Sequence, residues 1–219
     1  MSKIPVLFRN RHFLAVHKPP GINSQPGVPN HPTVLGLLQI QYPKLFAPKA
    51  DPFHEPKLVH RLDRPVTGAL LLGTSVLGTR TLAKRFKEGT IGKLYHAIVP
   101  QISSRATEGT ITLGNSVTTY KVLLTDYRYS LLSLIPKTGK KHQLREFCAK
   151  WLQAPVLGDK LFGSSIALPD GKIALHCSSM RFPFGLETIV ISAEPRKEDG
   201  IFHVYGHSRW WKNNYGRLP

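Results

Sequence analysis

An aspartate at the end of a short apolar segment is the residue in this sequence best suited to chemistry. Asp63 closes the segment Leu58–Asp63 and comes just before the turn that leads through Gly68 into the apolar run Ala69–Leu72. Loops at strand ends are where folds present reactive side chains. An aspartate in such a place is also often part of a turn or of a surface ion pair. The apolar approach and the following strand favour the catalytic interpretation.

Two other segments offer companions for this carboxylate. In Lys93–Val99, strand alternation places Tyr95 on one face together with every second residue. In Thr138–Arg145, Arg145 lies beside the apolar stripe of its expected helix, so its stem can pack while its guanidinium reaches inward. The ordinary alternatives are a tyrosine that only packs in the core and an arginine that is only a solvated cation.

The three side chains would form a coherent catalytic device. A guanidinium in contact with a carboxylate stabilises its ionised form, so Arg145 would keep Asp63 charged and oriented. Tyr95 would add a flat surface and a hydroxyl group. This combination suits covalent or electrostatic work on a small planar substrate.

The elements that must position these residues are mostly short strands. Alternation, β-branched residues and turn signals place them along the whole chain. The expected strands are Ile4–Phe8, Phe13–His17, Ala69–Leu72, Lys93–Val99, Thr110–Leu113, Thr119–Thr125, Tyr129–Ile135, Lys172–Cys177 and Thr188–Ser192.

Three helices are expected between these strands. A short one spans Thr33–Gln41, and a second follows residue 72 and ends at Gly89. The apolar stripe of the second helix is Leu82, Ala83 and Phe86. The third spans Lys141–Leu152, with a stripe formed by Leu144, Phe147, Cys148 and Trp151. Many strands with a few interspersed helices predict an α+β fold with a mixed sheet.

The stretch from Pro19 to Pro56 is rich in proline, which excludes a long helix or a central strand there. A linker between two domains has this composition. So does a set of ordered loops that surrounds a site.

The composition points to a polyanionic partner. The 219 residues contain 41% hydrophobic residues, enough for a packed core, and have a formal net charge of +17. Such an excess of cations attracts nucleic acid in the first place and an anionic membrane surface in the second. No apolar run approaches the about eighteen residues that span a bilayer. Two cysteines without a CxxC pair argue against a disulfide framework or a thiolate metal site, and favour a reducing compartment.

Six short motifs, in this order, resemble those of the RluA-type pseudouridine synthases. They are His17-Lys18-Pro19-Pro20-Gly21, His60-Arg61-Leu62-Asp63 with Thr67-Gly68, Lys93-x-Tyr95, Thr138–Arg145, Leu157–Gly163 and Leu175-His176. Each motif is weak alone, but six in the correct order form a strong signal. The resemblance extends over most of the chain, which we therefore expect to be a single catalytic domain over residues 1–219, without a separate N-terminal RNA-binding domain.

The resemblance implies a fold and a reaction. The fold is a mixed, largely antiparallel central β-sheet with flanking helices and loops. The reaction cleaves the bond from uracil N1 to the sugar, turns the base and rejoins it through C5. By resemblance, Asp63 is the catalytic carboxylate, Tyr95 stacks on the base and helps to remove the C5 proton, and Arg145 pairs with the aspartate. No metal, nucleotide or redox cofactor is implied, and we expect a monomer.

An RNA substrate would be held by cations and by polar groups of the motifs. The target uridine must leave its stack, at a cost of a few kcal/mol that backbone contacts offset. The residues predicted to bind RNA are His60, Arg61, Arg64, Arg80, Lys84, Lys93, Lys140, Lys141 and His142, with Lys87 and Lys150 as further candidates for phosphate contacts. A surface position without an RNA contact is an equally good interpretation of Arg64.

The chain also departs from the family pattern. Lys140 replaces the usual arginine of the TGR motif, which keeps the charge but loses a bidentate fork. Arg64-Pro65 is bulkier and more basic than usual, and Cys177 stands where alanine is common. The C-terminal Trp210 and Trp211, among basic residues, would either stack on RNA or cap the core.

Several functional alternatives stay open at this point. A non-catalytic RNA-binding or ribosome-assembly factor could keep the same fold, although the three candidate catalytic residues argue against it. A membrane-surface protein would need an amphipathic anchor helix, which is missing, so we expect no membrane partner. The RNA can be ribosomal or transfer RNA. Residues 1–50 contain no Asp or Glu, as in organellar transit peptides, which favours a mitochondrial ribosomal RNA over a cytoplasmic target.

Overall fold

The computed structural model describes residues 3–26, 31–46, 55–102 and 107–201. The predictions for Trp210 and Trp211 fall outside these ranges. The chain divides into two compact units: unit 1 is Met1–Gly92 with Ser179–Ala193, and unit 2 is Lys93–Ser178 with Glu194–Pro219. That these units act as one catalytic domain stays a prediction.

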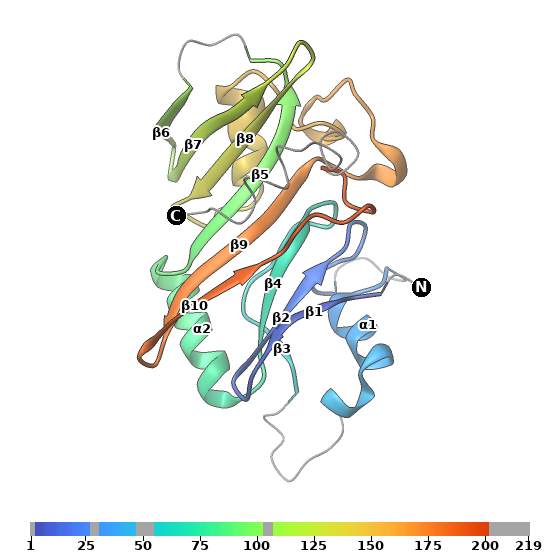
Figure 1. Cartoon of the computed structure of the whole chain (residues 1–219), viewed down its shortest axis with the longest axis vertical. Coiled ribbons are helices and arrows are strands. Elements are labelled where there is room, and N and C mark those ends of the chain that lie inside the picture. Colours follow the sequence, from blue (N-terminus) through green and yellow to red (C-terminus); the bar gives the residue numbers. More distant parts are fainter. Residues whose placement is uncertain (1–2, 27–30, 47–54, 103–106, 202–219) are drawn as a thin grey trace. The chain divides into compact units, whose positions relative to one another are not determined.

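Unit 1 combines a twisted β-sheet with two α-helices (Figure 1). Its elements are β1 (Val6–Arg9), β2 (Phe13–Lys18), α1 (Val34–Gln41), the 3₁₀ turn η1 (Pro43–Leu45), β3 (Lys57–Leu58), β4 (Thr67–Gly73), α2 (Val76–Glu88) and β10 (Glu187–Ser192). The strand β9 (Leu175–Phe184) begins in unit 2 and continues into unit 1.

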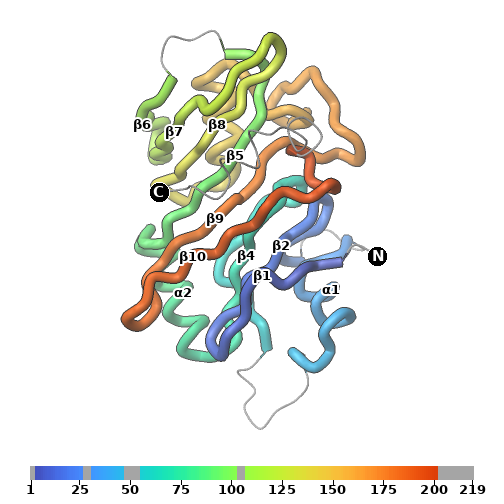
Figure 2. Tube along the Cα trace, viewed as in Figure 1, coloured from blue at the N-terminus to red at the C-terminus, as the bar shows by residue number. Residues whose placement is uncertain are grey.

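The strand order of unit 1 is β1-β2-β4-β9, with β3 also paired to β4 and β10 to β9. In the antiparallel pair of β2 and β4, which lie side by side in Figure 2, Lys18 is opposite Gly68 and Phe13 is opposite Gly73. Aromatic rings fill the space around Phe13, whose centroid lies 5.4 Å from that of Phe182 and 5.3 Å from that of Phe184. This core holds β2, which ends at Lys18, and β4, which begins after the Asp63 turn.

The helix α2 ends where the sequence predicts, at Gly89, and a serine caps its start. Ser75 accepts a hydrogen bond from the N–H of Gly78 at the start of the helix, and Gly89 ends it in the left-handed conformation with φ 70°. Leu82 is buried, but Ala83 is exposed, so the predicted stripe is narrower than three residues. The small side chain of Ala83 adds little apolar area, which makes burial at that position weakly favourable.

Unit 2 contains the strand order β9-β5-β8-β7-β6. Its elements are β5 (Gly92–Pro100, whose first residue belongs to unit 1), β6 (Glu108–Leu113), β7 (Ser116–Thr125), β8 (Tyr129–Pro136), α3 (Gln143–Glu146), the π-helical turn η3 (Phe147–Trp151) and the 3₁₀ turns η4 (Lys160–Phe162) and η5 (Pro169–Gly171). The pairs β5–β8, β8–β7 and β7–β6 are antiparallel. The predicted α+β class with a largely antiparallel sheet is confirmed.

The third predicted helix differs from expectation in two ways. It begins at Gln143 rather than Lys141, after His142 in the left-handed conformation with φ 58°. From Phe147 it winds as a π-helix, in which the N–H of Leu152 donates to the carbonyl of Phe147, five residues earlier. The extra residue in that turn rotates Trp151 away from the stripe, and its exposed fraction is 48%.

The strand predicted at Lys172–Cys177 is found at Leu175–Phe184. Ala174 lies before it, where its N–H donates to the carbonyl of Leu157 and its own carbonyl accepts from Ile98. The predicted strand stopped at Cys177, seven residues before the observed end at Phe184, because Pro183 in the second half of β9 is a poor strand former.

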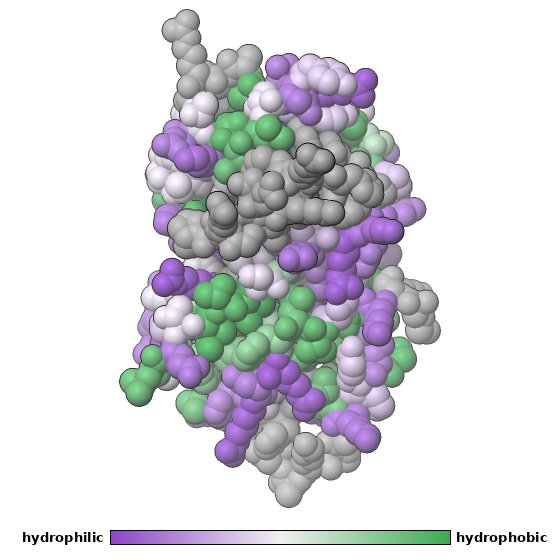
Figure 3. Space-filling view, in the orientation of Figure 1, coloured by the Kyte–Doolittle hydropathy of each residue, from purple (hydrophilic) through white to green (hydrophobic). Residues whose placement is uncertain are grey.

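Apolar side chains are exposed on one face of unit 1, over β1 and the hairpin of β9 and β10 (Figure 3). Val6 is 38% exposed, Phe8 37% and Val190 58%. No helix within the described ranges combines the length and the apolar character needed to cross a bilayer.

Candidate active site

Asp63 occupies a tight turn that leads into β4. The carbonyl of Asp63 accepts a hydrogen bond from the N–H of Val66 at 3.0 Å, and β4 begins one residue later, at Thr67. Leu62 and Val66 on either side are buried, whereas Asp63 itself is half-buried and Arg64 is exposed. The turn therefore has buried apolar ends and presents its aspartate at the edge of the core.

A fully buried lysine fixes this turn from the neighbouring strand. The ammonium of Lys18 donates to the carbonyls of Arg64 at 3.0 Å, Val66 at 2.8 Å and Pro19 at 3.0 Å. A lysine ammonium has three donors, and a buried charge is tolerated only when such partners are present. Lys18 reaches this position because its strand pairs with β4 in a register that places it opposite Gly68.

A buried serine holds the other side of the turn. The hydroxyl of Ser24 donates to the carbonyl of Leu62 at 2.7 Å and accepts from the N–H of Leu62 at 3.0 Å. The N–H of Gly21 also donates to the carbonyl of Arg64. Ser24 and Gly21 of the proline-rich segment that follows β2 thus order the turn of Asp63. That this segment surrounds a catalytic site stays a prediction.

His60 links the same loop to β4 and α2. Its Nε2 accepts a hydrogen bond from the N–H of Leu71 at 2.9 Å, so the ring is deprotonated at that nitrogen. The ring also stacks on Phe86, with 4.2 Å between centroids and 22° between planes. The structure thus gives His60 a packing role, and its contact with RNA stays a prediction.

In unit 2, Tyr95 and Lys93 lie on β5. Tyr95 is buried and pairs with Leu134 of β8. Lys93 is half-buried, and its ammonium donates to the carbonyl of Thr138 at 3.3 Å. Burial lowers the pKa of Lys93 below its ordinary value. The Lys-x-Tyr motif is therefore in contact with the loop that precedes α3.

A buried glutamine shapes that loop. The side-chain oxygen of Gln143 accepts from the Thr138 hydroxyl at 2.8 Å and from the N–H of Lys140 at 3.1 Å. Its side-chain nitrogen donates to the carbonyl of Val117 at 2.9 Å and to the Thr118 hydroxyl at 3.1 Å. One side chain thereby fixes the turn from which the exposed cation Lys140 projects.

Arg145 is held by a buried ion pair. Its Nε donates to Oδ2 of Asp159 at 2.6 Å and its Nη2 to Oδ1 at 2.7 Å, and both side chains are almost completely buried. The guanidinium carbon lies 4.8 Å from the ring centroid of Phe162, a cation–π contact. The bidentate fork and the ring fix the orientation of the guanidinium.

The Cys148 thiol is buried close enough to Asp159 for its pKa to be affected by that carboxylate. Burial raises the pKa of the Cys148 thiol well above its ordinary value, and the charge of Asp159 raises it further. Both Cys148 and Cys177 are free and buried. The Cys148 thiol is therefore an inert core group.

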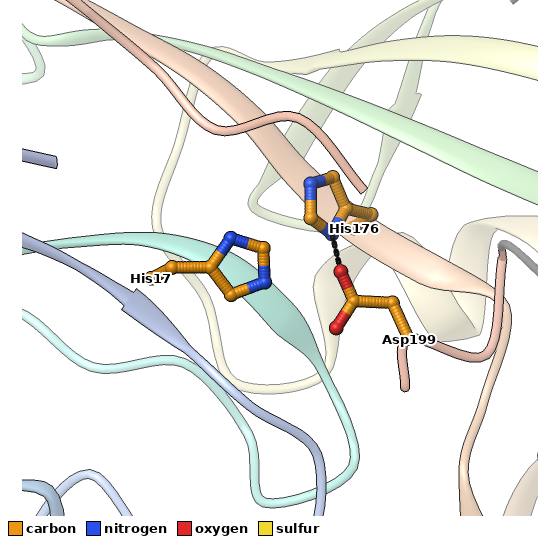
Figure 4. Close-up of side chains that lie close together, drawn as sticks. All are labelled: His17, His176 and Asp199. Carbon is orange, nitrogen blue, oxygen red and sulfur yellow. Dashed lines mark ion pairs between the residues drawn. The ribbon is translucent and has the colours of Figure 1, made fainter. Parts of the chain in front are cut away.

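A second buried polar group of unit 2 lies at the start of β9. Nδ1 of His176 is 3.5 Å from Oδ2 of Asp199, and both side chains are fully buried (Figure 4). Ser178 is within hydrogen-bond distance of Nδ1 of His96, at 2.5 Å. Burial lowers the pKa of His96 to about 3, with a smaller effect from His176.

The predicted site residues are distributed over both units. Asp63 belongs to unit 1, and Tyr95 and Arg145 belong to unit 2. That these three side chains meet stays a prediction. Among the predicted RNA-binding residues, the exposed ones are Arg61, Arg64, Arg80, Lys84, Lys140 and Lys141, and the half-buried ones are His60, Lys93 and His142. The exposed Lys84 and Lys150 each have a glutamate at i±4, at 3.8 and 3.7 Å.

Three residues that orient the candidate site residues were not among those predicted from the sequence. Ser24, Gln143 and Asp159 each make two or more hydrogen bonds to a candidate residue or to its loop. Asp159 had a signal, because it lies inside the Leu157–Gly163 motif, but its partner was not deducible. Ser24 had none.

Comparisons with known proteins agree on one family. Residues 12–150 match the family model described as RNA pseudouridylate synthase. The 21S rRNA pseudouridine(2819) synthase of Eremothecium gossypii is 32% identical over 217 residues, which cover 90% of this chain and 79% of that protein. Ribosomal large subunit pseudouridine synthase D of Borreliella burgdorferi is 31% identical over 187 residues, 74% of this chain, and the match spans only 56% of that protein.

A solved structure has the same fold. The human protein named RNA Pseudouridylate Synthase Domain Containing 4 superposes with a TM-score of 0.74 at 21% identity, over 91% of this chain and 92% of that chain.

Proposed function

Because the chain belongs to the RNA pseudouridylate synthase family, we propose that it converts a uridine of ribosomal RNA to pseudouridine with Asp63 as its catalytic carboxylate. The observation that supports this role best is the structure around Asp63. Buried side chains fix the backbone before and after it, while its own side chain is only half-buried. A fold that orders a turn so tightly around one accessible carboxylate is suited to placing that carboxylate against a substrate.

The reaction needs only side chains and is balanced within the nucleotide. The bond from N1 to C1′ breaks, the base turns, C5 bonds to C1′, C5 loses a proton and N1 gains one. Asp63 stabilises or attacks the reacting centre, and Tyr95 stacks on the base and takes part in removing the C5 proton. Arg145 pairs with the carboxylate of Asp63, and its guanidinium is held in a fixed orientation by the two bonds from its Nε and Nη2 to Asp159.

Of the two RNA classes, ribosomal and transfer RNA, we propose ribosomal RNA as the substrate. The similar protein from Eremothecium gossypii, which matches over most of this chain, is named for 21S rRNA, and the one from Borreliella burgdorferi is named for the ribosomal large subunit. The net charge of +17 provides the attraction for a long polyanion. The acid-poor residues 1–50 support a mitochondrial ribosomal RNA in particular. Fractionation of cells that express the full chain with a C-terminal tag tests the compartment, and exclusion from mitochondria contradicts it.

The test of the reaction is conversion of uridine in defined RNAs. Purified protein is incubated with ribosomal RNA fragments and with transfer RNAs, and pseudouridine is measured by nucleoside mass spectrometry. We expect conversion in ribosomal RNA by the wild type and by Asp170→Asn, a control at a carboxylate that is 80% exposed. Asp63→Asn should give none.

The other outcomes separate the alternatives. Conversion in transfer RNA alone overturns the substrate class and keeps the reaction. RNA binding without conversion in any RNA favours a binding or ribosome-assembly factor. Full activity in Asp63→Asn overturns the role of Asp63.

A further inference from the structure

We propose that Ser24 is a positioning residue for Asp63, a role that rests on the proposed function of that carboxylate. The hydroxyl of Ser24 is bound to both backbone groups of Leu62, the residue just before Asp63. It donates to the Leu62 carbonyl at 2.7 Å and accepts from the Leu62 N–H at 3.0 Å. Ser24 is only 4% exposed, so water does not compete well for these bonds.

The loop needs such a partner because it leaves the sheet. The pairing of β3 with β4 ends at Leu58, and β4 begins only at Thr67. Leu62 is buried between these points, and buried backbone groups must find hydrogen bonds. Ser24 gives Leu62 the two bonds that a neighbouring strand would otherwise give. Without them, the peptide that leads into Asp63 would have an unpaired donor and an unpaired acceptor in the core.

The serine is itself held firmly. The next residue toward the N-terminus, Asn23, forms a parallel bridge with Thr33, and its carbonyl accepts from the N–H of Val34 at the start of α1. Gly21, three residues before Ser24, donates to the carbonyl of Arg64. Ser24 therefore transmits the fixed position of α1 to the residue before Asp63, while Lys18 fixes the residue after it.

The expected consequence is a loss in the chemical step rather than in RNA binding. A small displacement of a catalytic group costs about a hundredfold in rate, whereas the RNA contacts of exposed cations do not depend on Leu62. We expect Ser24→Ala to lower kcat by about ten- to a hundredfold with KM for RNA changed less than about twofold. Ser24→Thr, which keeps the hydroxyl, should recover most of the loss.

A matched control removes a buried hydroxyl elsewhere in unit 1. Thr74 is 7% exposed, and its hydroxyl donates to the carbonyl of Arg11 at 3.2 Å. Thr74→Val therefore measures the cost of a lost buried hydrogen bond of the same kind. It should lower the melting temperature, though less than Ser24→Ala does because only one side-chain bond is lost, and leave kcat unchanged. Equal kcat in Ser24→Ala and Thr74→Val overturns the proposal.

Amide hydrogen exchange tests the contact without any substrate. In Ser24→Ala, the Leu62 amide should exchange more than about tenfold faster, while the Thr74 amide, bound to the carbonyl of His12, stays protected. An unchanged Leu62 amide overturns the proposal. If the wild type converts no RNA but the Leu62 amide exchanges faster in Ser24→Ala, the proposed function is wrong and the hold of Ser24 on the loop is supported.

Discussion

The ion pair between Arg145 and Asp159 holds the Arg145 guanidinium in a fixed orientation inside unit 2. The pair is bidentate and almost fully buried, and Phe162 covers the guanidinium. Such a pair contributes little net stability, because desolvation offsets the attraction. Its value lies in the fixed direction that the pair gives to the guanidinium.

Removal of Asp159 should therefore be far more damaging than the loss of an ordinary salt bridge. Asp159→Asn leaves the charge of Arg145 buried without its counterion, at an expected cost of about 3–5 kcal/mol in the free energy of unfolding. Asp170→Asn, which breaks the 3.3 Å contact of an exposed carboxylate with Lys172, should cost less than about 1 kcal/mol. Urea unfolding measures both variants, and similar losses would contradict the buried pair.

His96 makes the stability of unit 2 depend on pH. Its pKa is about 3 in the folded chain and about 6.5 when unfolded, so the unfolded chain binds the proton first as pH falls. Stability contributed by neutral His96 is complete above about pH 6.5 and is lost as the pH falls toward about 3. From about pH 7 to 5 the expected loss is about 2 kcal/mol.

The variant His96→Gln isolates this contribution from that of the neighbouring His176 and Asp199. Glutamine does not titrate and can still bond to Ser178. Chemical unfolding at the two pH values should show a smaller decrease in the variant than in the wild type. An equal decrease would assign the pH dependence to other groups.

At the scale of elements, α2 is positioned by its closest approach to the turn between β1 and β2. A Cβ added to Gly78 would come within 1.8 Å of the carbonyl oxygen of His12. The same turn is bound by Thr74, whose N–H donates to that oxygen, and by Ser75, whose hydroxyl lies 3.0 Å from Nδ1 of His12. This contact sets how the helix with Arg80 and Lys84 lies on its strands.

Gly78→Ala should therefore destabilise the fold, although alanine is the better helix former by about 1 kcal/mol. The backbone must shift to admit the methyl group, and such overpacking costs about 1–3 kcal/mol or more. The control is Gly36→Ala in α1, where a Cβ would meet only the Thr33 hydroxyl at 3.2 Å. Thermal unfolding should rank Gly78→Ala clearly below Gly36→Ala, and the reverse order would contradict the close contact.

Local signals predicted the elements well where they agreed with tertiary packing. The end of α2 at Gly89 and the strands β5 and β8 were predicted because capping and alternation are local. The late start of β9 was missed because Ala174, just before it, bonds to Leu157 and Ile98, which are distant in sequence. The π-helical turn after Glu146 was missed because the apolar spacing there fits a regular α-helix. Asp63, Tyr95 and Arg145 were candidates from their motifs, but their supports Ser24 and Asp159 depend on contacts 38 and 14 residues away.

For the whole molecule, the positive charge should appear as a salt dependence of RNA binding. If about six cations contact phosphates, log K should fall against log salt with a slope near −4, at about 0.7 per contact. Filter binding between about 50 and 200 mM salt measures this slope. Lys140→Ala should reduce the magnitude of this slope by about 0.7, the value of one phosphate contact. Lys121→Ala should leave the slope unchanged, because the Lys121 ammonium lies 2.9 Å from the Glu108 carboxylate. A slope near zero would contradict an electrostatic mode of binding.

The burial of Lys18 has a consequence for experiments that map the RNA footprint. Amine-acylating reagents modify lysines in proportion to solvent access, and the ammonium of Lys18 is enclosed by three carbonyls. It should resist labelling both with and without RNA, while exposed lysines such as Lys140 lose reactivity when RNA covers them. Lys18 would thus be a built-in reference, and its labelling would report that the turn at Asp63 has opened.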